Sequence, residues 1–235
     1  MRAMILAAGR GERMREFTAQ TPKPLLRVDG RYLIEYPLEN LRRAGIREVV
    51  INVSYLGEQI QAALGDGSRF GIKIIYSVEP ERLEVGGGIF QALPHLGAEP
   101  FIVVSGDVIT DYPLANLPQQ PVGLAHLVMI DNPTFHPKGD FGLREGYVDK
   151  DAKPTLTFAN IGVYRPEVFA GCQPGHFRWS QVMMPAIQQG KVTGEHFRGT
   201  WYNVGSPEEL AIANARARED SNLRPLASET NTLSN

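Results

Sequence analysis

Short apolar runs alternate with amphipathic segments through the first half of the chain. Residues 3–7, 49–53, 72–76 and 101–105 each form a run of the length expected for a buried strand. Residues 33–43 and 56–64, between these runs, carry apolar side chains at helical spacing and are followed by Gly45 and Gly65. Such alternation is typical of a parallel sheet covered by helices. We therefore predict an α/β fold, with a Rossmann-like, mostly parallel central sheet and helices on both faces.

The second half of the chain has a less regular pattern. Apolar runs predict strands over residues 124–130, 161–164, 192–197 and 201–204, and residues 141–147 carry a hairpin around Glu145-Gly146. A helix is expected over residues 180–188. Another begins where Ser206 precedes Pro207 and ends near Glu219. The remaining residues are polar. We predict a single domain over residues 1–219 and a disordered tail over residues 220–235.

Composition narrows the class of function. Twenty-four basic and twenty-six acidic side chains leave a net charge of −2, without the basic excess of a nucleic-acid-binding protein. A single cysteine excludes an internal disulfide, and no apolar run approaches the ~20 residues of a membrane span. The chain starts directly with a strand, which leaves no room for a signal peptide, so we expect the cytoplasm. The oligomeric state stays open between a monomer and a weak dimer.

The first apolar run ends in a segment suited to phosphate. Gly9 and Gly11 allow the backbone to turn sharply and bring amide groups close to an anion. Arg13 and Lys23 add positive charges, and the prolines on either side of Lys23 keep it out of a helix. A phosphate-binding loop is the favoured interpretation, and a plain strand-to-loop turn is the alternative.

Two further segments carry candidate chemistry. Asp107 follows the apolar run 101–105 and Gly106, where its carboxylate can hold Mg²⁺ at the edge of the sheet or simply cap the next turn. Residues 86–88 are three consecutive glycines before a predicted short helix over residues 89–93. They indicate that a flat group of a ligand approaches the backbone closely. The alternative is that they only make the start of the helix flexible.

The motif L-A-A-G-x-G-x-R-M at residues 6–14, together with P-K-P-L at 22–25, resembles the signature of the sugar-1-phosphate nucleotidyltransferases. The resemblance implies the nucleotidyltransferase (GT-A-like) fold and transfer of a nucleotidyl group to a sugar-1-phosphate, with Mg²⁺ as cofactor and these two small molecules as partners. It implies a catalytic set and a nucleotide-binding set. The catalytic residues are Arg13, Lys23 and Asp107, and the nucleotide-binding residues are Ala7, Ala8, Gly9, Gly11, Glu79, Gly86 and Gly87.

The second metal ligand implied by the resemblance lies in W-Y-N-V-G-S-P-E, residues 201–208. Asn203 stands there where many family members have aspartate. An amide oxygen still suits Mg²⁺, although it brings no charge. The alternative is a strand-end residue that bonds to nearby backbone. The expected metal ligands are therefore Asp107 and Asn203.

Two other motifs are similar to the subfamily of N-acetylmuramate α-1-phosphate uridylyltransferases. They are D-N-P-x-x-H-P-x-G-D-F at residues 131–141 and G-E-H-x-R-G-x-W at 194–201. This resemblance implies UTP as donor, a UDP-sugar and pyrophosphate as products, and a role in recycling of bacterial cell-wall (peptidoglycan) sugar. The expected sugar-binding residues are Asp140, Asn160, Gly162 and Arg198. Lys138 and Arg198 are candidates to meet a lactyl carboxylate, although an ordinary exposed charge is the alternative for each.

Three rival functions remain open at this stage. A different substrate pair, GTP with mannose-1-phosphate or dTTP with glucose-1-phosphate, would preserve the chemistry. A non-catalytic sugar-nucleotide sensor is suggested by Asn203 and by Val85, which replaces a threonine of the subfamily. A glycosyltransferase would usually carry a D-x-D metal motif, and Asp107 and Asp111 lack that spacing.

Overall fold

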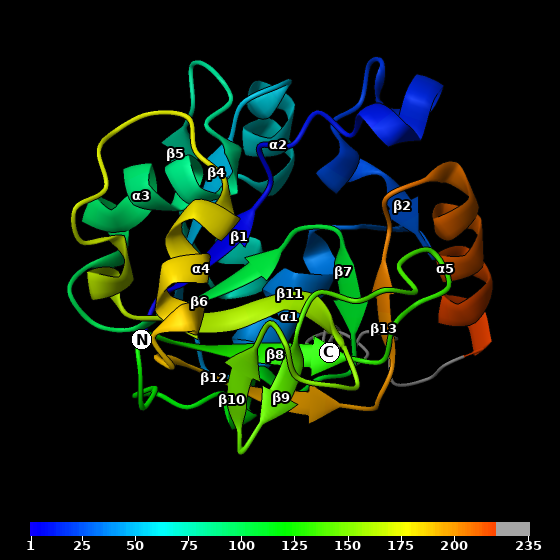
Figure 1. Cartoon of the computed structure of the whole chain (residues 1–235). Coiled ribbons are helices and arrows are strands. Elements are labelled where there is room, and N and C mark those ends of the chain that lie inside the picture. The colour runs from blue at the N-terminus through cyan, green and yellow to red at the C-terminus, as the bar shows by residue number, and fades with distance from the viewer. Residues whose placement is uncertain (220–235) are drawn as a thin grey trace, which may run out of the picture.

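A nine-stranded sheet forms the centre of the molecule in the computed structural model, which describes residues 1–219 (Figure 1). The strand order is β5-β4-β1-β6-β11-β8-β12-β10-β9. The strands are β1 Ala3–Leu6, β4 Glu48–Val53, β5 Lys73–Val78, β6 Phe101–Ser105, β8 Ala125–Ile130, β9 Gly142–Arg144, β10 Tyr147–Asp149, β11 Thr157–Tyr164 and β12 Val192–Phe197. The predicted tail over residues 220–235 lies outside the described residues.

The first four sequential strands of this sheet form a parallel unit. β5, β4, β1 and β6 are parallel neighbours, with Ala3 of β1 in register with Val49 on one side and Ile102 on the other. β11 then runs antiparallel between β6 and β8, β12 returns parallel to β8, and the β9–β10 hairpin closes the far edge. The α/β fold class predicted from the sequence is confirmed.

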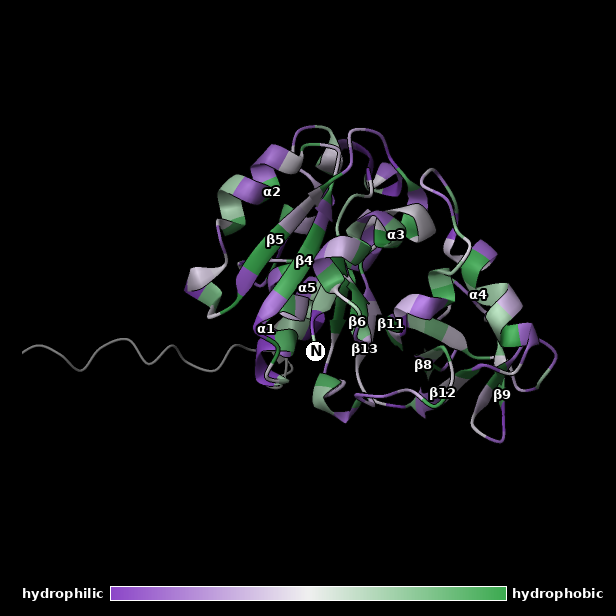
Figure 2. Ribbon diagram, turned by 90° about the vertical axis from the view of Figure 1, so that its left-hand side faces the viewer, coloured by the Kyte–Doolittle hydropathy of each residue, from purple (hydrophilic) through white to green (hydrophobic). Residues whose placement is uncertain are grey.

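Helices cover both faces of the sheet (Figure 2). α1 (Glu35–Arg43) and α2 (Gly57–Leu64) pack on one face, and α3 (Glu84–Leu96) and α4 (Trp179–Gln188) on the other. Side chains alternate along each strand, so that Ile5 joins the first core and Met4 the second, both fully buried. This two-sided burial explains why the parallel strands are near-continuous apolar runs.

A two-stranded ribbon and a C-terminal helix extend the molecule on the side of β2 (Arg27–Val28) (Figure 1). β13 (Trp201–Asn203) is the strand predicted at the end of the chain, and it pairs antiparallel with β7 (Val108–Thr110), which the sequence pattern did not indicate. α5 (Pro207–Glu219) buries Leu210 and Ala213 against Met14 and Val28. The ribbon therefore brings α5 back to the segment that follows β1.

One predicted helix boundary is wrong. The short helix expected over residues 89–93 begins at Glu84 and continues to Leu96, so the three glycines lie in its first turn rather than before it. Glycine disfavours helix interiors, but close packing of other chain segments against this turn holds it in place. Among residues 1–219, no helix is both long enough and apolar enough to cross a membrane.

Candidate functional site

The segment after β1 forms the wall of a cavity of about 260 Å³ at the carboxyl end of the parallel strands. Its lining residues are Gly9, Arg10, Gly11, Glu12, Arg13, Lys23, Arg82 and Gly205. We call it the phosphate cavity. Gly11 has a left-handed φ of 67°, and a β-carbon there would lie 3.0 Å from Thr18 Cγ2 and 3.1 Å from Lys23 Cβ. Both the backbone conformation and the tight space therefore favour glycine at position 11.

Positive charge gathers around this cavity. Arg10, Arg13, Lys23 and Arg82 all line it, against the single carboxylate of Glu12. The Arg13 guanidinium lies against Gly205, where a β-carbon would be 2.6 Å from Nη2, and it forms no ion pair with any residue in the described part of the chain. A cavity with this balance of charge favours an anion, as the phosphate-loop hypothesis requires.

Lys23 and Asp107 meet beside the phosphate cavity, although they are 84 positions apart in the chain. Lys23 Nζ donates to Asp107 Oδ2 in a short ion pair, and both side chains are largely buried. Asp107 stands between β6 and β7, and Val204 N donates to its carbonyl oxygen at 2.9 Å. The β7–β13 ribbon therefore carries both residues of the predicted metal site to one place.

The Asn203 amide faces the Asp107 carboxylate with one terminal atom 3.0 Å from Oδ2 and 3.2 Å from Oδ1. With nitrogen in that position, Asn203 donates hydrogen bonds to the carboxylate. With oxygen there, the two acceptors need a cation between them. Neighbouring ligands of an octahedral Mg²⁺ are about 3 Å apart, because each Mg–O distance is about 2.1 Å. The donor set and its spacing therefore fit Mg²⁺, although residues 1–219 hold no cluster of three or more His, Cys, Asp or Glu side chains suited to a metal.

A second cavity, of about 150 Å³, adjoins the first through Gly9. Its lining residues are Leu6, Ala8, Gly9, Asn52, Glu79, Arg82, Glu84, Val85 and Ser105. We call it the base cavity, because its lining combines apolar side chains with a few polar groups, and such a pocket next to a phosphate site suits a nucleobase. Three of the expected nucleotide-binding residues, Ala8, Gly9 and Glu79, line it directly.

A buried hydrogen-bond chain connects the base cavity to the phosphate loop. Ala7 N donates to Asn52 Oδ1 at 2.9 Å, and Asn52 Nδ2 donates to Glu79 Oε1 at 2.7 Å. The other carboxylate oxygen of Glu79 accepts from Leu83 N at 3.1 Å. Burial raises the pKa of Glu79 above its ordinary value, while the Asn52 and Leu83 hydrogen bonds and the Arg82 charge oppose the increase. Each polar group in this chain has a partner, as burial demands.

Parts of the protein itself occupy the space beside the three glycines. A β-carbon at Gly86 would lie 2.8 Å from Arg178 O, and one at Gly87 would lie 2.2 Å from Gly175 O. At Gly88 it would lie 2.5 Å from Glu79 Oε1. Gly87 N already donates to Phe177 O at 3.0 Å. Side chains at positions 86–88 would thus clash with the segment 175–178 or with Glu79, which explains the three glycines. Gly86 and Gly87 do not line the base cavity.

The four expected sugar-binding residues lie on or beside the strands that follow β6. Asp140 is fixed by Phe158 N, which donates to Oδ2 at 2.9 Å, and Asn160 has a left-handed φ of 57° where β11 is bulged between Phe158 and Gly162. Gly162 is buried in β11, and Arg198 is exposed just after β12. None of the four lines the two cavities described above.

Both histidines of the 131–141 and 194–201 motifs contact aspartate side chains. His136 Nε2 lies 3.1 Å from Asp140 Oδ1, and His196 Nε2 lies 2.9 Å from Asp131 Oδ1. The second pair joins the two motifs across β8 and β12. His196 therefore helps to hold the two motifs together, whereas His136 contacts a residue of its own motif.

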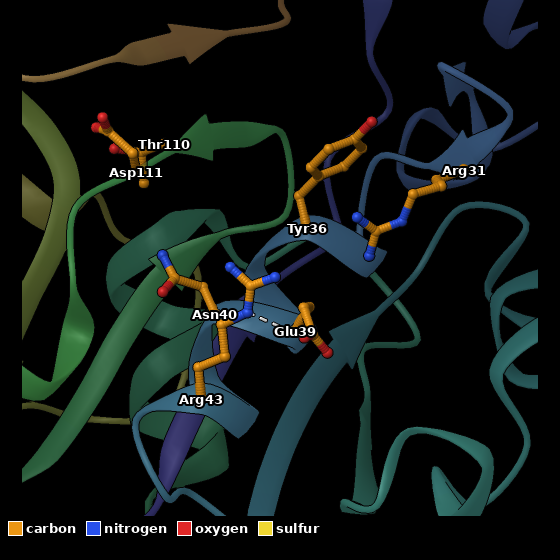
Figure 3. A pocket seen from close by; sticks show the side chains of 7 residues that line it. All are labelled: Arg31, Tyr36, Glu39, Asn40, Arg43, Thr110 and Asp111. Atoms are coloured by element: carbon orange, nitrogen blue, oxygen red, sulfur yellow. Dashed lines mark hydrogen bonds and ion pairs between the residues drawn. The ribbon is translucent and has the colours of Figure 1, made fainter. Parts of the chain in front are cut away.

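A third cavity, of about 360 Å³, lies away from the predicted site, between α1 and the end of β7 (Figure 3). Its lining residues are Arg31, Tyr36, Glu39, Asn40, Arg43, Thr110 and Asp111. Asp111 has a structural task, since its Oδ1 accepts from Thr200 N at 2.7 Å and so ties the ribbon together.

Sequence reasoning missed several residues that line the site, among them Asn52 and Arg82. Asn52 is a polar residue inside the apolar run 49–53, and a polar side chain in a buried strand is itself a signal of a hydrogen-bonding task. Arg82 borders both cavities, yet its surroundings in the sequence contain nothing that distinguishes it from an ordinary surface arginine.

Comparison with known proteins identifies the family and the fold of the chain. Residues 2–220 match the sequence model of the family described as Nucleotidyl transferase. The N-acetylmuramate alpha-1-phosphate uridylyltransferase of Neisseria meningitidis serogroup B is 46% identical over 92% of this chain and 98% of its own length. The protein of the same description from Caulobacter vibrioides is 32% identical over 92% and 97%. The solved inositol-1-phosphate CTP transferase of T. maritima, 21% identical, has the same fold, with a TM-score of 0.74 over 93% of this chain and 96% of that one. The family resemblance found in the motifs is confirmed.

Proposed function

The chain belongs to the nucleotidyl transferase family, and we propose that it transfers UMP from UTP to a sugar-1-phosphate and releases pyrophosphate. The sugar that its similarity to two uridylyltransferases favours is N-acetylmuramic acid α-1-phosphate. The reaction would serve recycling of cell-wall sugar in the cytoplasm.

The observation that carries this proposal is the convergence of Lys23, Asp107 and Asn203 beside the phosphate cavity. Nothing local in the sequence requires these three side chains to meet, because they come from three distant segments. A cation, a carboxylate and an amide oxygen at the end of a phosphate loop are the groups needed to bind and neutralise a triphosphate.

The expected mechanism is an in-line displacement at the α-phosphorus of the nucleotide. A sugar phosphate is largely dianionic at neutral pH, since its second pKa is about 6, so its oxygen can attack without a general base. The backbone amides around Gly9 and Gly11, with Arg13, would hold the β- and γ-phosphates. Lys23 would neutralise charge that develops on the α-phosphate. The rate enhancement then comes from positioning and charge neutralisation.

Asp107 and Asn203 would hold Mg²⁺ through their side-chain oxygens. The metal would supply Lewis-acid neutralisation of the phosphate oxygens. In this arrangement Asp107 serves both the metal and Lys23. Because Asn203 contributes no charge, more of the affinity for the metal must come from the triphosphate itself.

The proposal is tested by measuring pyrophosphate release for UTP, GTP, dTTP and CTP, each with N-acetylmuramic acid, N-acetylglucosamine, glucose and mannose 1-phosphates in Mg²⁺. We expect strong turnover with UTP and the muramic acid substrate. Turnover only with another pair would refute the substrate assignment but leave the reaction class. Nucleotide binding without turnover of any pair would refute the enzyme and favour a sensor.

A further inference from the structure

Arg82 borders the phosphate cavity, the base cavity and a further cavity next to them. A further cavity of about 480 Å³ shares Arg10 and Glu12 with the phosphate cavity and Ala8 with the base cavity. Its lining residues are Ala8, Arg10, Glu12, Ser54, Tyr55, Pro80, Glu81 and Arg82. Arg82 is the residue that the three linings have in common. It therefore stands where the three cavities meet.

The guanidinium of Arg82 is held at this junction by Glu84. Arg82 Nη2 lies 3.0 Å from Glu84 Oε1, and the arginine side chain is 48% exposed. Glu84 opens α3 with a left-handed φ of 60°, a conformation that a non-glycine residue rarely adopts. Such backbone persists only where its surroundings enforce it, and it concentrates at ligand sites. The carboxylate is thus placed on the wall of the base cavity by an unusual local conformation.

The Arg82–Glu84 pair can be displaced by a phosphate group. A half-exposed ion pair contributes little, because water competes for both charges. A guanidinium can bind phosphate oxygens through two parallel hydrogen bonds, which is a stronger interaction. Two neighbouring cations are already engaged in other ways, since Lys23 pairs with Asp107 and Arg10 lies over the Tyr55 ring. Arg13 lacks an ion pair within residues 1–219, but it borders only the phosphate cavity, whereas Arg82 borders all three cavities.

We propose that Arg82 binds the phosphate chain of the nucleotide at the junction of the base and phosphate cavities, and that Glu84 holds it there until the nucleotide arrives. This inference rests on the proposed function. Arg82 then acts as a substrate-binding residue whose contribution depends on the phosphates and not on the base.

The test compares the wild-type protein with Arg82→Ala and Arg82→Lys. Affinity for UTP is measured by calorimetry, and affinity for uridine, which has no phosphate, is measured by displacement of a fluorescent UTP analogue. Arg144→Ala is the matched control. It also removes an arginine from an exposed ion pair, with Asp149 at 2.7 Å, but on the β9–β10 hairpin at the far edge of the sheet. Melting temperatures establish that each variant is folded.

We expect Arg82→Ala to weaken UTP binding about 10- to 100-fold, the usual loss for a hydrogen bond to a charged group. Uridine binding should change less than about twofold, and Arg82→Lys should recover part of the loss, because it retains the charge without the planar fork. The control should bind UTP as the wild type does.

Three results would overturn the inference. Unchanged UTP binding by Arg82→Ala would show that the guanidinium does not reach the phosphates. An equal loss for UTP and uridine would mean that Arg82 only shapes the base cavity. If the wild type itself does not bind UTP, the proposed function fails together with the inference, and this outcome differs from the first two because it is seen without any substitution.

Discussion

Replacement of Asn52 by leucine tests the buried chain that connects the base cavity to the phosphate loop. Asn52 is 4% exposed and uses both ends of its amide, accepting from Ala7 N at 2.9 Å and donating to Glu79 Oε1 at 2.7 Å. Leucine has a similar volume and no hydrogen-bonding group. The substitution therefore removes two hydrogen bonds and leaves the space filled.

The expected loss of stability follows from what is left unpaired. Ala7 N–H loses its only acceptor in a buried position, at about 1–3 kcal/mol, and the Glu79 carboxylate loses a charge-assisted hydrogen bond, at about 1.5–3 kcal/mol. Glu79 keeps Leu83 N as a donor, so it is not wholly unpaired. We expect the free energy of unfolding to decrease by roughly 2–5 kcal/mol in total. For a chain of this size this lowers Tm by roughly 4–20 °C.

The same change should depend on pH. Burial already raises the pKa of Glu79 in the folded protein, and loss of the Asn52 donor raises it further. A raised pKa in the folded state means that the folded protein binds the proton more tightly than the unfolded chain. Stability is thus greatest below the ordinary pKa of a carboxyl and falls as pH rises through the folded-state value. The difference between wild type and variant should be smaller at about pH 5 than at about pH 8.

Urea unfolding at both pH values measures the difference directly. Asn40→Leu is the control, because Asn40 lies in a partly buried position and donates a single bond, to Tyr112 O at 2.9 Å. It should cost about 1 kcal/mol without the pH dependence. A loss below about 1 kcal/mol for Asn52→Leu at about pH 8 would refute this account of the buried chain.

Three further predictions concern the predicted metal and phosphate groups. Asp107→Ala should abolish pyrophosphate release while the circular dichroism spectrum stays native. EDTA should likewise stop the wild-type reaction. If the variant retains turnover, the assignment of Asp107 as a metal ligand is wrong. Lys23→Met should lower kcat roughly 100- to 1,000-fold and cost about 2–4 kcal/mol of stability, because it leaves the largely buried Asp107 carboxylate without its cation. A variant without a cooperative melting transition would contradict this prediction, because its turnover would then be lost through unfolding. Asn203→Asp should retain turnover and lower the Mg²⁺ concentration needed for half-maximal rate, since a second carboxylate adds charge to the site; an inactive but folded variant would contradict the proposed ligand role.

Much of the fold could be predicted from the sequence because its signals are local. The buried strands of the parallel unit are apolar runs, and β6 and β12 begin and end at the predicted residues. Gly11 adopts a left-handed φ that favours glycine, and this preference is local to the residue. The phosphate loop could therefore be recognised without knowing which distant segments pack against it. The helix around the three glycines was misplaced because its stability comes from the segment 175–178, which is distant in the chain.

The sequence by itself determined the layers of the molecule and the residue types available for phosphate and metal, since hydrophobic periodicity and glycine conformation act over a few residues. Only the tertiary structure decided which of these residues meet. The Lys23–Asp107 pair, the Asn52–Glu79 hydrogen bond and the position of Arg82 between the cavities depend on strand order and on the β7–β13 ribbon. Hydrogen bonds and ion pairs act over about 3 Å, and a distance that short between remote residues is set by packing of the whole chain.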